Sequence, residues 1–399
     1  MPVQTSRRSP SPDQTEPPGR TGTTVGKSTR GGKRARRKDP LWARLALIMG
    51  AVLLVSSGVA IVGSKVVINQ ATSGIEQENL LGDAGKSDAE GGKDLEGPIN
   101  MLLLGVDVRG AWGPENVRAD TIIVLHIPAS HDQAYLVSIP RDTEVQVPAS
   151  KKSGWGGGTA KINSAFEIGA KNGAGWAGGA QMMAATIKNL TGISFDGAAI
   201  INFEGFKKVI DALGSVHLCV DQEVTSYHMK WVDGKPMWNS DAERSGKPMK
   251  PIVHKKGCRD MKGWEALDFS RQRYGLKNGD YDRQQHQQQL IKAMAKKAMD
   301  SGVITNPIKL NGLVKSAGEA FVLDTGGTPV ADFVFTMRGV AANDLVMLRT
   351  NDGHFNSVTE GAEEREVLKP ISLEMFKAVR DDKLADFIAA NPNVISTKK

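Results

Sequence analysis

Arginine and aspartate side chains are concentrated at five places in this 399-residue chain, each at the edge of a predicted strand or helix. Guanidinium groups bind phosphate oxygens in pairs and stay charged at any working pH. Loops at strand ends often carry function, so the recurrence predicts one shared site for a phosphate-containing anion. The five segments are GVDVRG (Asp107, Arg109), VRADT (Arg118, Asp120), SIPRDT (Arg141, Asp142), SRQR (Arg271, Arg273) and GDYDRQQHQQQ (Asp280, Asp282, Arg283, His286).

Two of the aspartates, Asp107 and Asp120, supply the hard oxygen ligands that Mg²⁺ prefers. One or two carboxylates plus substrate phosphates are the usual ligands of this ion. Arginines and Mg²⁺ together would neutralise charge on a leaving phosphate, which is the main requirement of phosphoryl transfer. The alternative is that each Arg–Asp pair is a surface ion pair that contributes little to stability.

Other kinds of site lack their sequence patterns. The chain contains no HExxH, no paired CxxC, no GxSxG and no GxGxxG after a strand. The GDAGKS segment is not a phosphate-binding P-loop, because Leu80 stands where that pattern needs glycine. The net charge of +7 comes from the first 44 residues, which hold 11 basic and three acidic side chains. The nearly neutral remainder argues against a nucleic-acid partner.

Hydrophobic periodicity predicts an α/β domain with a central sheet and helices outside. Residues 221–262 have weak periodicity and are interpreted as a lid or surface lobe, and residues 302–390 as the completion of the same domain. The predicted strands cover 101–104, 121–127, 134–139, 198–203 and 216–220, with 121–139 forming a hairpin; the predicted helices cover 178–190, 206–213, 282–299, 371–378 and 382–390.

Residues 45–64 form an uncharged apolar run, long enough to cross a ~30 Å hydrocarbon core as a helix. A dense cationic stretch precedes the run, so the positive-inside rule places the N-terminus in the cytoplasm and the rest outside. A cleavable signal peptide and a buried core helix are the alternatives. The predicted organisation is a disordered basic cytoplasmic tail (1–40), a transmembrane helix (41–65), an extracytoplasmic linker (66–98), a catalytic domain (99–390) and a C-terminal tail (391–399).

The chain has two cysteines, Cys219 and Cys258. Two free buried thiols are a common alternative. An oxidising compartment outside the membrane favours a disulfide bond between them.

Six stretches resemble the LytR-CpsA-Psr family of cell-envelope enzymes, in the order in which the family has them. The resemblance covers residues 100–298 and extends more weakly to 390. Together with the single anchor, this order is far more specific than any one motif. The stretches are NMLLLGVDVRG, VRADTIIVLHI, VSIPRDTEVQVP, KINSAFEIG, LTGISFDGAAIINFEGFKKVIDALGSV, and the run from GWEALDFSRQR to GDYDRQQHQQQ.

The resemblance implies an extracytoplasmic, Mg²⁺-dependent phosphotransferase that moves a glycopolymer from a polyprenyl-pyrophosphate carrier onto peptidoglycan. It implies a three-layer fold with a central mixed sheet flanked by helices, and an apolar tunnel for the prenyl chain. His286 replaces a family arginine, and Ser215 follows Gly214 where the family has a second glycine. The implied residues are Asp107 and Asp120 at the metal, and Arg109, Arg118, Arg141, Arg271, Arg273, Arg283 and Gln287 on the pyrophosphate, with Asp107, Asp120, Arg118 and Arg141 catalytic; Lys161 and Asn163 also match.

The expected reaction is attack of a peptidoglycan hydroxyl on the sugar-proximal phosphorus, with Asp120 or Asp142 as proton acceptor. The prenyl tail is expected to lie beside helices such as residues 203–213, and the membrane lipid is an expected partner. Hydrolysis of the pyrophosphate is an expected side activity. One alternative is a non-catalytic regulator of the envelope that binds polyprenyl pyrophosphate, and another is a plain phosphatase or pyrophosphatase. Teichoic acid, capsule and related glycopolymers all suit the expected site.

Overall fold

The computed structural model describes residues 76–87, 95–108, 115–303, 306, 309, 312–313, 315–316, 318–328, 345–360 and 363–396. The predicted basic tail, the apolar run at 45–64, most of the linker and Arg109 lie outside these residues. Within the described ranges, no helix combines the length and apolarity that a membrane span requires.

Seven strands form a central mixed sheet in the order β1-β13-β7-β2-β3-β4-β14. The pairs β1–β13, β7–β2 and β4–β14 are parallel, and the pairs β13–β7, β2–β3 and β3–β4 are antiparallel. The predicted central sheet and the predicted hairpin are therefore confirmed. The strands are β1 (Glu76–Gln77), β2 (Ile99–Val106), β3 (Ala119–Ile127), β4 (Ala134–Ser138), β7 (Gly197–Asn202), β13 (Phe321–Asp324) and β14 (Leu345–Arg349).

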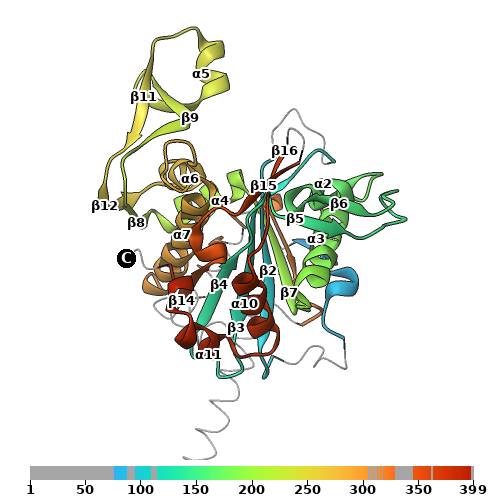
Figure 1. Ribbon diagram of the computed structural model, residues 1–399. Coiled ribbons are helices and arrows are strands. Elements are labelled where there is room, and N and C mark those ends of the chain that lie inside the picture. The colour runs from blue at the N-terminus through green and yellow to red at the C-terminus, as the bar shows by residue number, and fades with distance from the viewer. Residues whose placement is uncertain are drawn as a thin grey trace, which may run out of the picture. The chain divides into compact units, whose positions relative to one another are not determined.

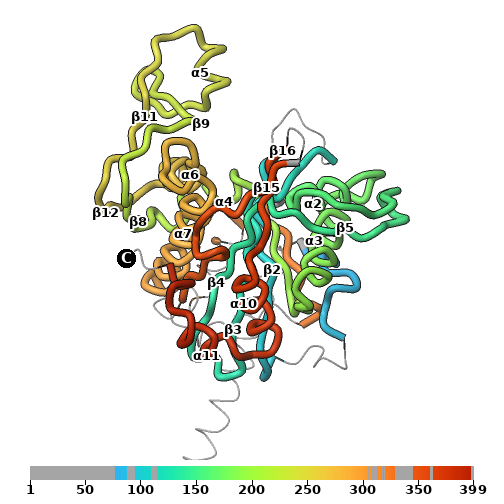
Figure 2. The backbone as a smooth tube through the Cα atoms, in the orientation of Figure 1, coloured from blue at the N-terminus to red at the C-terminus, as the bar shows by residue number. Residues whose placement is uncertain are grey.

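Helices flank the sheet on both sides, as predicted. Figures 1 and 2 show α6 and α7 on one side of the sheet and α2 and α3 on the other. The α-helices are α2 (Ile162–Ala170), α3 (Gly175–Thr191), α4 (Phe203–Leu213), α5 (Asn239–Ser245), α6 (Gly263–Arg271), α7 (Asp280–Asp300), α10 (Pro370–Arg380) and α11 (Leu384–Ala390), and the 3-10 turns are η1 (Gly82–Ala84), η3 (Gly318–Ala320), η5 (Thr350–Gly353) and η6 (Pro392–Val394).

Two predicted boundaries are wrong for local reasons. Phe203 begins α4 instead of ending a strand, because the Asn202 side chain caps the helix by accepting a hydrogen bond from Gly205 N at 2.8 Å. The last helix begins at Leu384 rather than at 382, because Asp382 has a φ of 53°, outside the right-handed helical region.

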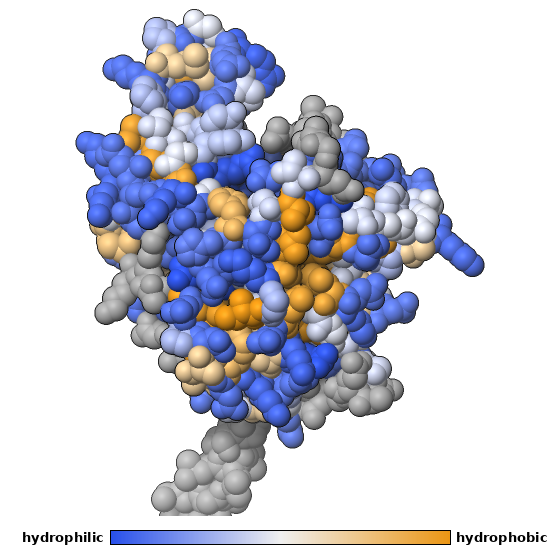
Figure 3. All heavy atoms as spheres, in the orientation of Figure 1, coloured by the Kyte–Doolittle hydropathy of each residue, from blue (hydrophilic) through white to orange (hydrophobic). Residues whose placement is uncertain are grey.

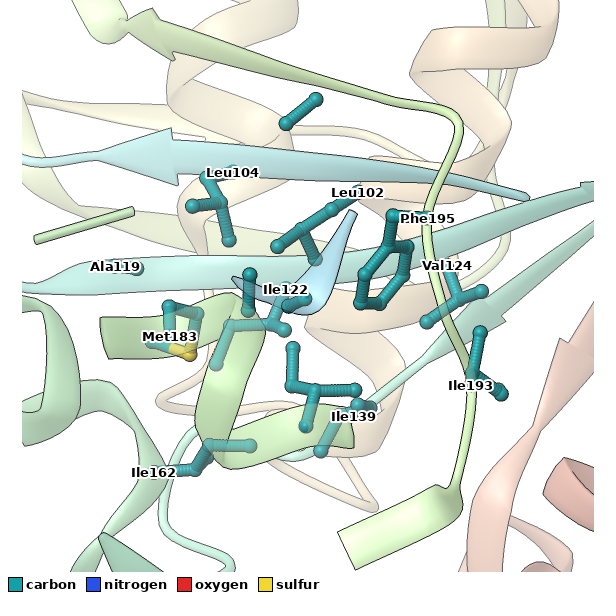
Figure 4. Packing of buried hydrophobic residues seen from close by; sticks show 14 of the residues in the cluster. Leu102, Leu104, Ala119, Ile122, Val124, Ile139, Ile162, Met183, Ile193 and Phe195 are labelled. Atoms are coloured by element: carbon teal, nitrogen blue, oxygen red, sulfur yellow. The ribbon is translucent and has the colours of Figure 1, made fainter. Parts of the chain in front are cut away.

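The main hydrophobic core lies between the sheet and the α2–α3 side (Figure 4). Leu102 and Leu104 of β2 point into this core, whereas Met101 packs in a smaller cluster on the other face. Because successive strand residues point to opposite faces, a strand buried on both faces is apolar almost throughout. This explains the continuous run MLLL that begins at Met101.

Residues 221–262 form a lobe with its own three-stranded sheet, ordered β10-β9-β11, together with α5. Two further two-stranded sheets, β5–β6 and β15–β16, lie near the ends of the central strands (Figure 1). The remaining strands are β5 (Glu144–Val147), β6 (Gly158–Lys161), β8 (Val216–Val220), β9 (Val224–Val232), β10 (Lys235–Trp238), β11 (Met249–His254), β12 (Gly257–Met261), β15 (Ser357–Glu360) and β16 (Glu363–Glu366).

Cys219 and Cys258 face each other across the antiparallel pair β8–β12 and form a disulfide bond, the pairing that the compartment argument favours. The bond closes a sequence separation of 39 residues at the base of the lobe. A cross-link of this span stabilises mainly by restricting the unfolded chain.

Replacing both cysteines, Cys219→Ser with Cys258→Ser, should lower the free energy of unfolding by about 2–4 kcal/mol. Denaturant titration of the wild type and the variant measures the difference. A reductant should destabilise the wild type and leave the double variant unchanged. Equal stability of both proteins under oxidising conditions would contradict the assignment.

A buried polar network lies where β2 begins and β3 ends. Lys86 Nζ lies 2.9 Å from Asp196 Oδ1, and Asp196 Oδ2 accepts a hydrogen bond from Asn100 N at 2.6 Å. His126 is fully buried, with Nδ1 at 2.8 Å from Asn100 Oδ1 and Nε2 at 3.2 Å from Asp382 Oδ1. Burial lowers the pKa of His126 to about 4, because it outweighs the opposing effect of Asp382 and is reinforced by Lys86.

His126 should make the protein less stable as the pH falls from about 6.5 to about 4. In that window the unfolded chain binds a proton at His126 and the folded chain does not, so the free energy of unfolding falls, by roughly 3 kcal/mol in total. Denaturant titrations at several pH values check this. His126→Gln, which keeps an amide near Asn100, should show a flatter dependence, and an identical slope in both proteins would refute the role.

Candidate active site

The end of β2 and the start of β3 place three of the predicted residues together. Asp107 directly follows β2, and its backbone N–H donates to the carbonyl oxygen of Arg118 at 3.4 Å, just before Asp120 in β3. The strands come close at Gly105, where an added Cβ would lie 2.8 Å from Thr121 Cβ. The close approach of these two strands therefore requires glycine at position 105. It places the carboxylates of Asp107 and Asp120 at the same end of the two strands.

Arg141 is the central cation of the site. It follows β4, and its Nη1 donates to Asp120 Oδ1 at 3.0 Å. Its Nε lies 3.5 Å from Asp142 Oδ2 and 3.7 Å from Asp280 Oδ1, without forming a hydrogen bond within the described structure. Lys161, at the end of β6, lies 3.3 Å from Asp142 Oδ1 through its Nζ atom. Arg141 and Lys161 thus hold Asp142 from two sides.

The N-terminus of α7 contributes a second arginine from far along the chain. Arg283 Nη2 donates to the backbone oxygen of Asp120 at 3.0 Å and lies 2.7 Å from Asp280 Oδ1. Arg283 Nε is buried and has no hydrogen-bond partner within the described structure. A buried N–H without a partner is costly, so this donor is suited to an acceptor from a ligand.

The C-terminus of α6 brings Arg271 to the first carboxylate. Arg271 Nη2 lies 3.3 Å from Asp107 Oδ2, and its guanidinium stacks over the Phe203 ring at 3.9 Å. Trp238 of the lobe lies near the same guanidinium, with its ring centroid 5.2 Å away. The lobe also binds α6 through a buried network in which Asp268 accepts from Ser226 Oγ at 2.9 Å. The lobe therefore supports the position of this arginine.

A cavity of about 610 Å³ lies among these side chains, and we name it the first cavity. Three of its described lining residues are basic and four are acidic, so an anion would meet no net positive charge there without an added cation. It is lined by Asp107, Asn116, Arg118, Asp120, Arg141, Asp142, Lys161, Asn163 and Glu167.

A neighbouring cavity of about 500 Å³ shares Arg141, Asp142 and Lys161 with the first, and we name it the second cavity. Its remaining lining residues are Pro140, Arg273, Tyr274, Gly279, Asp280, Tyr281, Phe355, Ser357, Glu364, Arg365 and Glu366.

The charges of the site keep Asp120 ionised. Burial alone would raise the pKa of Asp120, but the positive charges of Arg283 and Arg141 outweigh it and lower that pKa below its ordinary value. Burial lowers the pKa of Arg141, but the negative charges of Asp120 and Asp280 raise it by more, so the pKa lies above its ordinary value. Asp120 is accordingly suited to bind a cation and poorly suited to accept a proton near neutral pH.

The structure separates the predicted residues into groups. Asp107, Asp120, Arg118 and Arg141 line the first cavity, Arg271 and Arg283 contact its carboxylates or backbone, and Arg273 lines the second cavity. Gln287 is buried in α7 and lines neither cavity. The roles assigned to all these residues stay predictions.

His286, which replaces a family arginine, is directed away from both cavities. Its Nε2 lies 3.1 Å from Asp221 Oδ1, and its ring packs against Phe269 at 4.3 Å between centroids. It lines neither cavity.

Two lining residues were missed from the sequence, Asn116 and Glu167. Glu167 lies four residues after Asn163 in α2, and positions i and i+4 share one face of a helix. This spacing within KINSAFEIG was the available signal. Asn116 had no comparable signal.

The donor set of the first cavity fits Mg²⁺. Asp107 and Asp120 line the same cavity, both supply carboxylate oxygens, and the excess of acidic side chains calls for a cation if a pyrophosphate is to bind. Elsewhere in the described residues, the one group of three closely spaced metal-binding residue types is His217 with Cys219 and Cys258, and its two sulfurs are joined in the disulfide.

Comparison with known proteins identifies the family. The family model described as LytR_cpsA_psr matches residues 64–380. This chain belongs to the LytR-CpsA-Psr family. The resemblance drawn from six sequence stretches is thereby confirmed.

Relatives within the LytR-CpsA-Psr family are 28–30% identical to this chain over the aligned residues. Cell wall biosynthesis protein LcpA of Corynebacterium glutamicum is 28% identical over 297 residues, which cover 69% of this chain and 49% of LcpA. The polyisoprenyl-teichoic acid–peptidoglycan teichoic acid transferase TagU of Oceanobacillus iheyensis is 29% identical over 290 residues, or 70% of this chain and 76% of TagU. The match spans about half the length of several such relatives.

A solved structure agrees in fold. The crystal structure of TagV from B. subtilis superposes with a TM-score of 0.53 at 21% sequence identity, covering 73% of this chain and 99% of TagV. The central mixed sheet flanked by helices is thus shared with this structure.

Proposed function

We propose that this protein is an extracytoplasmic, Mg²⁺-dependent phosphotransferase that moves a glycopolymer from a polyprenyl-pyrophosphate carrier to a peptidoglycan hydroxyl. One observation carries the proposal. Arg271 and Arg283 reach Asp107 and Asp120 across sequence separations of 164 and 163 residues, beside the cavity that Arg118 and Arg141 line. Convergence of this kind contradicts the view that each Arg–Asp pair is an isolated surface ion pair.

The names of the relatives support the reaction class. TagU is named as a transferase of teichoic acid to peptidoglycan, and LcpA as a cell wall biosynthesis protein. The location outside the membrane is supported by the cationic stretch before the apolar run at 45–64, and by a disulfide bond in the folded part.

The pyrophosphate would bind in the first cavity. Arg118 and Arg141 provide guanidinium donors from its lining, and the buried Nε of Arg283 offers a further donor nearby. Asp107 and Asp120 would hold Mg²⁺, which supplies charge neutralisation for the phosphate oxygens when bound. Arg271, fixed by Asp107 and the Phe203 ring, orients that carboxylate.

In the reaction, the oxygen of the acceptor hydroxyl forms a bond to the glycopolymer-side phosphorus. The bond between that phosphorus and the bridging oxygen breaks, and polyprenyl phosphate leaves with this oxygen. The products are a phosphodiester that joins glycopolymer to acceptor, polyprenyl phosphate, and one proton. Asp142 is the better proton acceptor of the two candidates, because it lines both cavities and is 34% exposed, whereas the positive charges of Arg283 and Arg141 outweigh burial and lower the pKa of Asp120.

The prenyl chain is proposed to lie on the sheet face that α4 and α7 share. There Leu103, Ala199 and Phe321 from three neighbouring strands are only partly buried, together with Ile291 and Ala295 of α7. Each methylene removed from water contributes about 0.8 kcal/mol, so even partial burial of a long chain supplies substantial affinity.

The test uses the full-length chain in detergent with a polyprenyl-pyrophosphate-linked oligosaccharide and a peptidoglycan glycan acceptor. We expect a phosphodiester-linked product and polyprenyl phosphate, both dependent on the acceptor. Tight binding of the lipid without any product would instead indicate a regulator, and phosphate release that ignores the acceptor would indicate a pyrophosphatase. Either result would overturn the proposal.

A further inference from the structure

The second cavity differs in character from the first. Its charged lining is balanced, with four basic and four acidic side chains, and it includes aromatic side chains, which the described lining of the first cavity lacks. Two aromatic residues, Tyr274 and Phe355, line it while remaining 50% and 54% exposed. Figure 3 shows hydrophobic residues on the viewed face, from the neighbourhood of β15 down to that of α10, among residues that are largely hydrophilic.

The exposed rings are held by specific contacts instead of by burial. Tyr274 contacts both Arg273, whose guanidinium is 4.5 Å from its ring centroid, and Tyr227 of the lobe, whose ring centroid is 4.7 Å away. Arg273 Nη2 also donates to the Tyr274 hydroxyl at 2.5 Å. Tyr227 is itself fastened to α6, because its backbone N–H donates to Gln272 Oε1 at 2.9 Å.

Phe355, which also lines the second cavity, is held by similar contacts. Its ring packs edge-on against Tyr281, 5.4 Å between centroids, and the Tyr281 hydroxyl donates to Glu366 at 2.6 Å. Gly279 has a φ of +48° and leaves room for the ring, since an added Cβ would lie 3.2 Å from Phe355 Cζ. Rings that are fixed in place yet exposed lose little entropy when a ligand stacks on them.

Fixed aromatic faces beside carboxylates and guanidinium groups match the surface of a sugar ring, which has apolar C–H faces and a rim of hydroxyls. The shared wall of Arg141, Asp142 and Lys161 places any sugar bound here next to the proposed pyrophosphate site. A hydroxyl of that sugar would then adjoin Asp142, the proposed proton acceptor.

We infer that the second cavity binds a neutral saccharide unit of the acceptor glycan, with Tyr274 and Phe355 as its stacking platforms. The inference rests on the proposed phosphotransferase function, because that function gives the neighbouring cavity its pyrophosphate.

The test is calorimetric titration of the full-length chain in detergent with a neutral tetramer of N-acetylglucosamine. Tyr274→Ala and Phe355→Ala should each weaken binding about tenfold. The ring-preserving variants Tyr274→Phe and Phe355→Tyr should bind like the wild type. Leu373→Ala, which removes an equally exposed apolar side chain on α10, is the matched control and should have no effect.

Equal affinity of the wild type and the Tyr274→Ala, Phe355→Ala double variant would overturn the inference, as would the absence of tetramer binding to the wild type. The wild-type affinity for glycan-free polyprenyl pyrophosphate is measured in parallel and reports on the proposed function alone. Tetramer binding that persists with this lipid at saturation supports an acceptor site. Competitive displacement of the tetramer by the glycan of a lipid-linked donor would assign the cavity to donor sugar and refute the acceptor assignment.

Discussion

Arg118→Ala is expected to lower the rate of glycopolymer transfer by about 10²–10³-fold, the usual cost of removing one donor that stabilises developing charge. The side chain is 53% exposed and forms an ion pair with Glu167, with Nε at 2.7 Å from Oε2. An exposed pair of this kind contributes little to folding, so the free energy of unfolding should stay the same. Transfer kinetics and denaturant titration of the same preparations measure both effects.

Glu167→Ala is the matched control for Arg118. It removes the same ion pair and leaves the guanidinium in the first cavity. Under the proposed role it should keep most of the transfer activity. If both variants lose activity equally, the ion pair matters and the arginine has no direct role in phosphate binding. Arg118→Lys should recover only part of the rate, because an ammonium group cannot bind two phosphate oxygens in a fork.

Removing divalent cations is the second change with a large expected effect. A chelator should reduce transfer by at least about 10²-fold, and added Mg²⁺ should restore it. The physical reason is that four carboxylates line the first cavity, so a bound cation would reduce their repulsion of a pyrophosphate. Lipid binding, measured without turnover, should therefore depend on Mg²⁺ as well.

Asp107→Asn should raise the Mg²⁺ concentration needed for half-maximal lipid binding by about tenfold or more. The control is Asp132→Asn, in the turn between β3 and β4 at the opposite end of these strands, which should leave this concentration unchanged. Lipid binding that is indifferent to chelator, in wild type and variant alike, would exclude a metal ion from the site.

Much of the fold follows from local pattern. The apolar run at β2 and the β-branched runs at β3 and β4 indicate strands because side chains alternate between two faces. Helices α4 and α7 follow from the 3.6-residue period of their buried side chains. The short elements α2, α6, β5 and β6 escaped prediction, since few residues define their period and their neighbours in the fold decide their conformation.

The candidate site was predictable in its residue types and only partly in its arrangement. Arg118 and Asp120 are two positions apart in the sequence, just before and just inside the start of β3, so their proximity is local. Three features depend on how α6, α7 and β6 pack. Arg273 lines the second cavity instead of the first, His286 points toward Asp221, and Asp142 lies between the two cavities. The predicted anchor at 41–65 and the prenyl tunnel stay predictions.

The amino-acid sequence alone determined the chemistry that this protein has available. It supplies arginines with a fixed positive charge, carboxylates beside them, and apolar strands whose ends lie next to these charged residues. It also determined the family, because six motifs in order leave few other interpretations. Only the tertiary structure decided which charges meet. Contacts such as that of Arg271 with Asp107 join residues 164 positions apart in the sequence, and they arise from packing of the whole sheet and its helices. The second cavity likewise exists only because the segment after α6, the start of α7 and the β15–β16 hairpin bring Tyr274, Tyr281 and Phe355 to one place.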